Sequence, residues 1–198
     1  MIAVNPAFDM QLLRRRLLPV NTDLGTGEDH WSEAAVAVII DPSQNGGSIL
    51  LIRRTEREGD PWSGQVAFPG GRRVPSDRTF LDTAIRETKE EVGISLHQHE
   101  ILGVLPWVNT RTRRVRVVPF VFELRAGVEI HHNAEVAETF WVALREIANH
   151  LIIMSEVQVE SGTLVTDSYI LRGRVIWGLT FRIINILLDK GSIPTSTA

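Results

Sequence analysis

Residues 64–94 read GQVAFPGGRRVPSDRTFLDTAIRETKEEVGI and restrict the fold and the chemistry more than any other part of the chain. Three glutamates, Glu87, Glu90 and Glu91, fall within one turn of a predicted helix, where side chains three and four residues apart are neighbours. All three carboxylates therefore share one face. Like charges at this spacing repel by roughly a few tenths of a kcal/mol per pair, so the helix is slightly destabilised unless a cation binds there.

The carboxylates on this face favour a magnesium ion. Mg²⁺ prefers oxygen ligands, and in proteins it commonly binds a few carboxylates together with the phosphates of a substrate. Gly93 is positioned to end the helix. We expect the opposite face to pack into a core, and that face carries Ala84, Ile85, Thr88 and Val92.

A glycine pair precedes the glutamates, and an arginine accompanies them. Gly70 and Gly71 let the backbone approach a ligand closely, while Arg86 stands four residues before Glu90 and can pair with it. The whole string resembles the Nudix box, G-x5-E-x7-R-E-U-x-E-E-x-G-U, in which U is a bulky aliphatic residue. The matching positions are Gly71, Arg86, Glu87, Glu90, Glu91, Gly93 and Ile94.

Three positions depart from that pattern. The first acid of the box falls on Asp77, one extra residue separates this acid from Arg86, and Thr88 replaces a larger aliphatic residue. An aspartate with one insertion is similar to the subgroup of coenzyme A pyrophosphatases. That subgroup also carries a run similar to LLxxR…GQVAFPGG before the box, and this chain reads LLIRR at 50–54 and GQVAFPGG at 64–71.

Length and composition are typical of one globular domain. The chain has 198 residues, of which 43% are hydrophobic, enough for a sizeable core. We expect one domain over residues 1–198, with an N-terminal helix and loop at about 1–31 and a C-terminal hairpin and helix at about 150–198. A net charge of −3 gives no general attraction to nucleic acid or membranes, and the absence of cysteine excludes disulfides and cysteine nucleophiles. Without a recognisable signal peptide or spanning segment, we expect a cytoplasmic protein.

Apolar runs bounded by turn residues predict a mixture of strands and helices without the strict rhythm of a parallel sheet. The resemblance to the Nudix box implies an α/β/α sandwich around a mixed sheet. Besides the box helix, helices are expected at 7–18 and 176–189. Strands are expected at 34–40, 48–54, 100–108 and 115–124, with a strand running into a short helix at 139–147 and a hairpin of 151–160 and 163–172.

Basic and aromatic residues outside the box are candidates for holding the substrate. The run NTRTRRVRVVPF places four arginines within six residues; guanidinium groups pair well with phosphate, although a charged strand edge is the alternative. If a strand begins by Arg114, then Arg114 and Arg116 share one face. Trp62 stands where the subgroup often has a histidine, and it either stacks on a nucleobase or covers the core. The predicted substrate-binding residues are Arg53, Arg54, Trp62, Arg111, Arg113 and Arg114.

The resemblance also implies one more carboxylate outside the box, as a metal ligand or general base. Glu135 is the first candidate and Glu138 the second, whereas His131 and His132 are expected to be surface residues. The implied metal is Mg²⁺ or Mn²⁺, with Glu87, Glu90, Glu91 and the Gly71 carbonyl as ligands. The predicted catalytic residues are Glu90, Glu91, Arg86 and Glu135, and either Glu91 or Glu135 takes the proton of the attacking water.

Together these features imply a hydrolase of a nucleoside diphosphate linked to another group, with coenzyme A or its derivatives as the first substrate class. ADP-ribose, dinucleoside polyphosphates and nucleoside triphosphates are the alternatives. A nucleotide sensor without catalysis is less favoured, because such domains typically lose box glutamates that this chain keeps. Dimers are frequent in the family, so a homodimer is a further expectation.

Overall fold

The structure is a computed structural model that describes residues 9–23, 31–110 and 114–190. Its helices are α1 (Met10–Arg16), α2 (Phe80–Val92), α3 (Leu144–Asn149) and α4 (Gly178–Leu188), with a short 3-10 helix at Leu96–Gln98. The main sheet contains β1 (Ser32–Asp41), β2 (Ser48–Arg54), β3 (Val66–Ala67), β4 (Gly70–Arg72), β5 (Glu100–Val104), β6 (Val108–Asn109), β7 (Val115–Glu123) and β8 (Val136–Ala143). A second sheet contains β9 (Ile153–Val159), β10 (Gly162–Leu171) and β11 (Arg174–Trp177).

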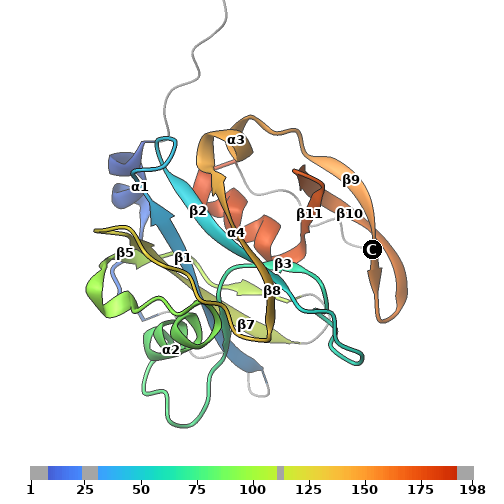
Figure 1. Cartoon of the computed structure of the whole chain (residues 1–198), viewed down its shortest axis with the longest axis horizontal. Coiled ribbons are helices and arrows are strands. Elements are labelled where there is room, and N and C mark those ends of the chain that lie inside the picture. The colour runs from blue at the N-terminus through green and yellow to red at the C-terminus, as the bar shows by residue number, and fades with distance from the viewer. Residues whose placement is uncertain (1–8, 24–30, 111–113, 191–198) are drawn as a thin grey trace, which may run out of the picture.

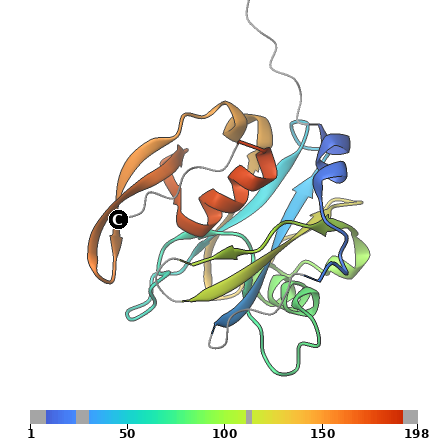
Figure 2. The same ribbon diagram turned by 180° about the vertical axis from the view of Figure 1, so that it is seen from behind.

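The main sheet is mixed and lies between helices. Its strand order is β3-β2-β1-β7-β5, with β4 beside β1, β6 beside β7 and β8 beside β2. β1 and β7 run parallel, whereas β1 and β2 form an antiparallel pair. Figures 1 and 2 show α2 on one face of this sheet and α4 on the other. The expected α/β/α sandwich with a mixed sheet is confirmed.

The central strand β1 shows how the sequence produces these layers. Successive side chains of a strand point to opposite faces, so a continuous apolar run buries both faces. Val36 and Val38 pack in the core cluster that includes α4, while Ala37 and Ile39 pack in the cluster that includes α2. The run AAVAVII therefore supplies the inner surface of both layers.

Most expected elements form near their expected positions, but one expected strand is interrupted and the short strands β3, β4 and β11 were not expected. The strand expected at 100–108 is interrupted, since β5 ends at Val104 and β6 begins at Val108. Pro106 lies in the gap, and proline cannot donate a hydrogen bond to a neighbouring strand. Strand β11 was not expected, because its four residues are too short for a clear period and its last two fell within the helix expected at 176–189.

The C-terminal sheet lies beside α4 at one side of the molecule (Figures 1 and 2). The expected hairpin is confirmed, with Gly162 paired to Val159 across the turn. Tyr169 of β10 is fully buried, and its hydroxyl donates a 2.8 Å hydrogen bond to Asn185 Oδ1 on α4. This bond fixes the C-terminal sheet to α4. That residues 1–198 form one domain stays a prediction.

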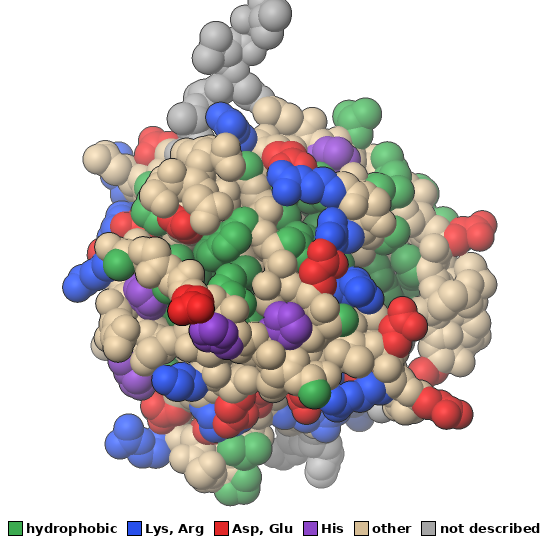
Figure 3. All heavy atoms as spheres, viewed as in Figure 1, with side chains coloured by type: hydrophobic (Ala, Val, Ile, Leu, Met, Phe, Trp, Pro, Cys, Tyr) green, Lys and Arg blue, Asp and Glu red, His purple; other side chains and the backbone are tan. Residues whose placement is uncertain are grey.

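The surface carries both signs of charge. On the face in Figure 3, basic and acidic side chains are interspersed, which fits the small net charge of −3. In the described part of the chain, no helix combines the length and apolar character that crossing a bilayer requires.

Candidate active site

A capping box and a buried ion pair fix the start of helix α2. Thr79 Oγ1 accepts a hydrogen bond from the Asp82 N–H (3.1 Å), and the Asp82 carboxylate accepts one from the Thr79 N–H (3.0 Å). Asp77 is buried just before the helix, where it accepts hydrogen bonds from Arg86 Nε (3.0 Å) and Nη2 (2.9 Å). This pairing with Arg86 holds the pKa of Asp77 well below its usual range. The aspartate in the first acid position of the box therefore anchors Arg86.

Arg86 also contacts two of the glutamates. Its Nη1 donates to Glu87 Oε1 at 2.8 Å and to Glu90 Oε2 at 3.2 Å, so the expected pairing with Glu90 is confirmed. One guanidinium thus links the buried Asp77 to the carboxylate face of α2. Its position restricts where Glu87 and Glu90 can lie.

The three glutamates have unequal surroundings. The exposed fraction of the side chain is 54% for Glu90, 17% for Glu87 and only 3% for Glu91. Glu91 Oε2 accepts a 2.8 Å hydrogen bond from the Gly70 N–H. Burial nevertheless raises the pKa of Glu91 to about 7. Glu91 can therefore exchange a proton near neutral pH, which a general base requires.

The glycine pair makes close contacts on both sides of β4, with the backbone of β1 at Gly70 and with the Glu87 side chain at Gly71. A Cβ on Gly71 would lie 2.4 Å from the Glu87 carboxyl carbon, and a Cβ on Gly70 would lie 2.4 Å from the Ala35 carbonyl oxygen. Gly70 also has a φ of +151°. The backbone of β4 therefore passes directly between β1 and the carboxylate of Glu87.

The loop between β7 and β8 brings Glu135 to this cluster. The Asn133 N–H donates to the Glu91 carbonyl (3.0 Å), and the Thr55 N–H donates to the Glu135 carbonyl (2.9 Å). Asn133 Oδ1 also accepts a 2.8 Å hydrogen bond from the Glu135 N–H. The negative charge of Glu135 contributes to the raised pKa values of Glu87 and Glu91. The carboxylate expected first outside the box thus lies within the electrostatic range of the box glutamates.

The second candidate, Glu138, faces the other side of the sheet. Glu138 lies opposite Arg53 in the β2–β8 ladder, and the register shifts between Arg53 and Arg54. Arg53 lies 3.5 Å from the Glu138 carboxylate. Arg54 instead points to the carboxylate cluster, 4.0 Å from Glu91 Oε1, and donates a 2.8 Å hydrogen bond to Asp60. Asp60 was missed by the sequence analysis, because it lies in a loop without periodicity or a motif that marks it.

The other predicted substrate residues are dispersed. Trp62 packs against the core with the guanidinium of Arg72 5.7 Å from its ring centre, which agrees with the core-covering interpretation. Arg111 and Arg113 lie outside the described residues. Arg114 is exposed and precedes β7 in the left-handed conformation, with φ at 48°. Arg116 is buried, with its guanidinium 4.6 Å from the Trp107 ring centre. Arg114 and Arg116 therefore do not lie together on one exposed face of a strand, where both could bind phosphate.

Comparisons with known proteins identify the family. Residues 31–159, more than half of the chain, match the model of the NUDIX domain. The chain belongs to the Nudix hydrolase family. A Photorhabdus laumondii protein named uncharacterized Nudix hydrolase NudL is 36% identical over 146 residues, which cover 71% of this chain and 76% of that protein.

Two further Nudix proteins complete the comparison. The peroxisomal coenzyme A diphosphatase NUDT7 of Mus musculus is 32% identical over 146 residues, which cover 71% of this chain and 60% of that protein. The expected resemblance to the coenzyme A subgroup is thereby confirmed. A solved binary complex of a C. elegans Ap4A hydrolase has a TM-score of 0.50 at 22% identity, covering 58% of this chain and 82% of that chain. This likeness supports the fold alone.

The carboxylates of the Nudix box fit a divalent cation in their chemistry. Burial raises the pKa values of Glu87 and Glu91. The charges of Glu90 and Glu135 add to the shift of Glu87, and those of Glu87 and Glu135 add to the shift of Glu91, so a cation nearby would relieve this repulsion. Oxygen ligands of this kind suit Mg²⁺ or Mn²⁺. Among the described residues, however, no three acidic or histidine side chains are already close enough to hold a metal. The side chains would have to rearrange to bind one.

Glu91 makes the stability of the metal-free Nudix protein depend on pH. Its folded pKa of about 7 lies above the ordinary 4.5, so its contribution to stability is fully present below pH 4.5 and is lost as the pH rises through about 7. The difference corresponds to about 3 kcal/mol. In EDTA, we expect Glu91→Gln to raise Tm relative to wild type more at pH 8 than at pH 5. A Tm difference independent of pH would contradict this buried position of Glu91.

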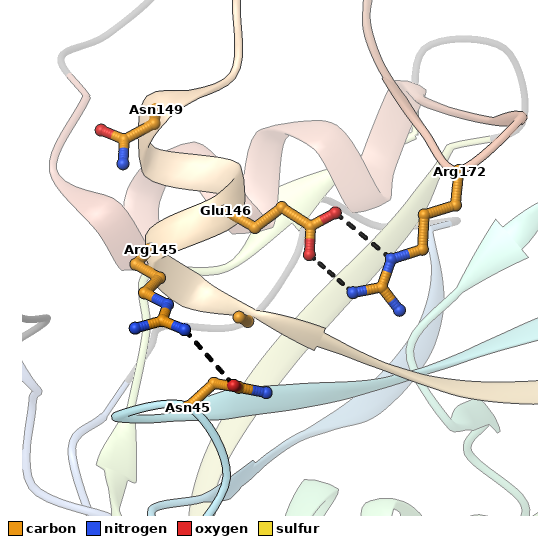
Figure 4. A pocket seen from close by; sticks show the side chains of 6 residues that line it. Asn45, Arg145, Glu146, Asn149 and Arg172 are labelled. Atoms are coloured by element: carbon orange, nitrogen blue, oxygen red, sulfur yellow. Dashed lines mark hydrogen bonds and ion pairs between the residues drawn. The ribbon is translucent and has the colours of Figure 1, made fainter.

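A charged pocket of about 350 Å³ lies at the end of β2 that is far from Arg53 and Arg54 (Figure 4). Arg172 donates to both oxygens of Glu146 (3.3 and 2.8 Å), and Arg145 donates to Asn45 Oδ1 (3.3 Å). The pocket lies near the Ser48 end of β2, roughly 17 Å from Arg53 along the strand at about 3.3 Å per residue. The ion pair between Arg172 and Glu146 connects the C-terminal sheet to α3 across this pocket. The pocket is separate from the carboxylate cluster.

Proposed function

We propose that this Nudix hydrolase cleaves the pyrophosphate of coenzyme A or its derivatives, in a reaction that requires Mg²⁺ or Mn²⁺. The observation that carries the proposal is the buried Glu91 beside Arg54 and the Gly70 backbone. This arrangement occurs in a chain that is 32% identical to a protein named coenzyme A diphosphatase. The sequence LLIRR at 50–54, followed by GQVAFPGG at 64–71, supports the same substrate class.

The proposed roles follow from burial and charge. Glu91 takes the proton of the attacking water, because it is a buried carboxylate beside the cluster that would hold the cation. Its pKa of about 7 belongs to the metal-free protein, and a bound cation would lower it. Glu135 is the alternative base. Arg86 orients Glu87 and Glu90, while Arg54 faces the same cluster and is positioned to bind a phosphate oxygen.

The cation would supply charge neutralisation on the phosphate oxygens and a more acidic water. Its proposed ligands are Glu87, Glu90, Glu91 and the carbonyl of Gly71. The remaining proposed substrate contacts are Arg53, Arg111, Arg113 and Arg114, whereas Trp62 packs against the core and is proposed to act on specificity only through the shape of its loop.

A different nucleoside diphosphate derivative is the second candidate substrate. Trp62 occupies the position where the coenzyme A subgroup often has a histidine, and this departure favours a changed specificity. ADP-ribose and dinucleoside polyphosphates keep the same bond to be cleaved. The proposed chemistry would therefore be unchanged with these substrates.

A product assay tests the proposal. Purified protein with Mg²⁺ is incubated with coenzyme A, ADP-ribose, NADH, a diadenosine polyphosphate and nucleoside triphosphates, and the products are separated by chromatography. We expect coenzyme A to yield 4′-phosphopantetheine and 3′,5′-ADP, with this activity lost in Glu91→Gln. Preferred cleavage of another compound would refute the coenzyme A assignment and retain the hydrolase chemistry. Absence of all turnover, with a ligand still raising Tm, would support a sensor instead.

A further inference from the structure

A second cleft, of about 700 Å³, lies between the ends of β2 and β8 and the C-terminal sheet. It lies on the opposite face of the main sheet from the carboxylate cluster, because Arg53 and Arg54 are neighbours on β2 and point to opposite faces. The charged and aromatic residues that line it are Arg53, Glu56, Glu138, Arg172, Arg174 and Trp177.

One carboxylate joins two arginines in this cleft. Glu138 lies 3.5 Å from Arg53 Nε and accepts hydrogen bonds from both Nε and Nη2 of Arg174, the former at 3.2 Å. Arg174 also lies over the ring of Phe140, 4.5 Å from its centre. The hydrogen bond from Arg174 lowers the pKa of Glu138, so this carboxylate stays ionised. Two guanidinium groups are thus held near each other by a single negative charge.

We infer that this cleft binds a phosphomonoester on the nucleoside half of the substrate, with Arg53 and Arg174 as its ligands and Glu138 as the counter-ion that the phosphate replaces. The inference rests on the proposed function, since it explains how the enzyme would distinguish coenzyme A from compounds that lack a phosphate on the ribose. It assigns a binding role to the C-terminal sheet, through Arg174 of β11.

The chain connects this cleft to the carboxylate cluster around the end of the main sheet. Glu135 precedes β8 and Glu138 lies three residues further along, about 10 Å in an extended segment. In the inferred binding mode the nucleotide passes around the ends of β2 and β8, with its pyrophosphate beside the carboxylate cluster and its ribose phosphate in the cleft. Trp177 and Val175 supply apolar surface in the same cleft, which suits the nucleoside between them.

The charges of the cleft favour a phosphomonoester over a singly charged group. A phosphomonoester carries a charge of about −1.5 to −2 at neutral pH and offers three acceptor oxygens, whereas a carboxylate carries one charge and offers two oxygens. Guanidinium groups bind such oxygens in a bidentate manner. A phosphate can therefore satisfy both Arg53 and Arg174 better than Glu138 does.

Binding of two small nucleotides tests the inference without turnover. The full-length Glu91→Gln protein is titrated calorimetrically with 3′,5′-ADP and with 5′-AMP, which differ in one phosphomonoester. We expect 3′,5′-ADP to bind at least about tenfold more tightly, as charged hydrogen bonds of this kind provide. Adding Arg174→Gln or Arg53→Gln should remove most of this preference. Adding Glu138→Gln should increase it, because the competing carboxylate is gone.

The Glu138 variant separates binding from a purely structural role. If Glu138 only joins the two sheets, its loss weakens or leaves unchanged the binding of both nucleotides, and this result would overturn the inference. Arg145→Gln removes an equal charge from the pocket in Figure 4 and should leave the preference unchanged. Equal affinities of the starting protein for both nucleotides, or a preference lost only in Arg114→Gln, would also overturn it. These binding results are independent of whether wild-type protein hydrolyses coenzyme A, so the two proposals fail separately.

Discussion

Replacing Glu91 with glutamine is expected to lower kcat by about a hundredfold to ten-thousandfold, the usual contribution of a general base. Glutamine has nearly the same shape, and its side-chain oxygen can still accept the hydrogen bond from the Gly70 N–H. The substitution therefore removes the charge and the proton acceptor while keeping the packing of a side chain that is 3% exposed. The measurement is kcat on the best substrate of the product assay, with circular dichroism to verify folding.

A matched control removes a glutamate elsewhere. Glu156 is exposed on β9, so Glu156→Gln should retain wild-type kcat. If Glu91→Gln is folded and also keeps near wild-type turnover, Glu91 has no central role. The proton acceptor would then be sought first at Glu135, the other candidate beside the cluster.

The second large effect concerns stability. Arg86→Met should reduce the free energy of unfolding by about 3–5 kcal/mol, because it leaves a buried carboxylate without its partner. The side chain of Asp77 is only 5% exposed and receives two hydrogen bonds from Arg86. Urea unfolding at pH 7 measures this loss. Arg78→Met is the control, since the side chain of Arg78 is 89% exposed and its ion pair with Asp82 should contribute about 0–1 kcal/mol.

The same ion pair predicts how this loss depends on pH. The folded pKa of Asp77 is lowered from 3.8, so its contribution is present above pH 3.8 and is lost as the pH falls through the folded value. The difference between wild type and Arg86→Met should therefore shrink in strong acid. Adding Asp77→Asn to Arg86→Met should recover part of the stability, because no buried charge remains. No recovery, or a loss below about 1 kcal/mol at pH 7, would show that the pair is not the anchor of α2.

Local spacing explains what could be predicted from the sequence. The helix, its end at Gly93 and the pairing of Arg86 with Glu90 depend on residues a few positions apart, where helical geometry is fixed. The opposite face of α2 packs as expected, with Ala84 and Val92 fully buried. The alternation of side chains along β1 likewise follows directly from its apolar run.

Contacts between segments that are distant in the sequence could not be predicted from local spacing. The contrast between Glu135 and Glu138 depends on the ladder of β8 with β2, where the register shifts beside Arg53. Arg116 looked like its arginine neighbours in sequence, but it is buried because β7 lies inside the sheet. The cleft beside Arg174 arises only when the C-terminal sheet packs near β8, and no short motif records that packing.

The last turn of α2 has a consequence for how the site opens. The Val92 and Glu91 carbonyls accept hydrogen bonds from the His131 and Asn133 N–H groups, and Asn133 in turn holds Glu135. Local opening in proteins occurs in cooperative units of neighbouring backbone bonds. Fraying of this turn would therefore displace Glu91 and release one end of the loop that carries Glu135. Glu135 would still be held by the Thr55 N–H, so opening at the end of α2 should separate the two candidate proton acceptors and leave Glu135 near its place.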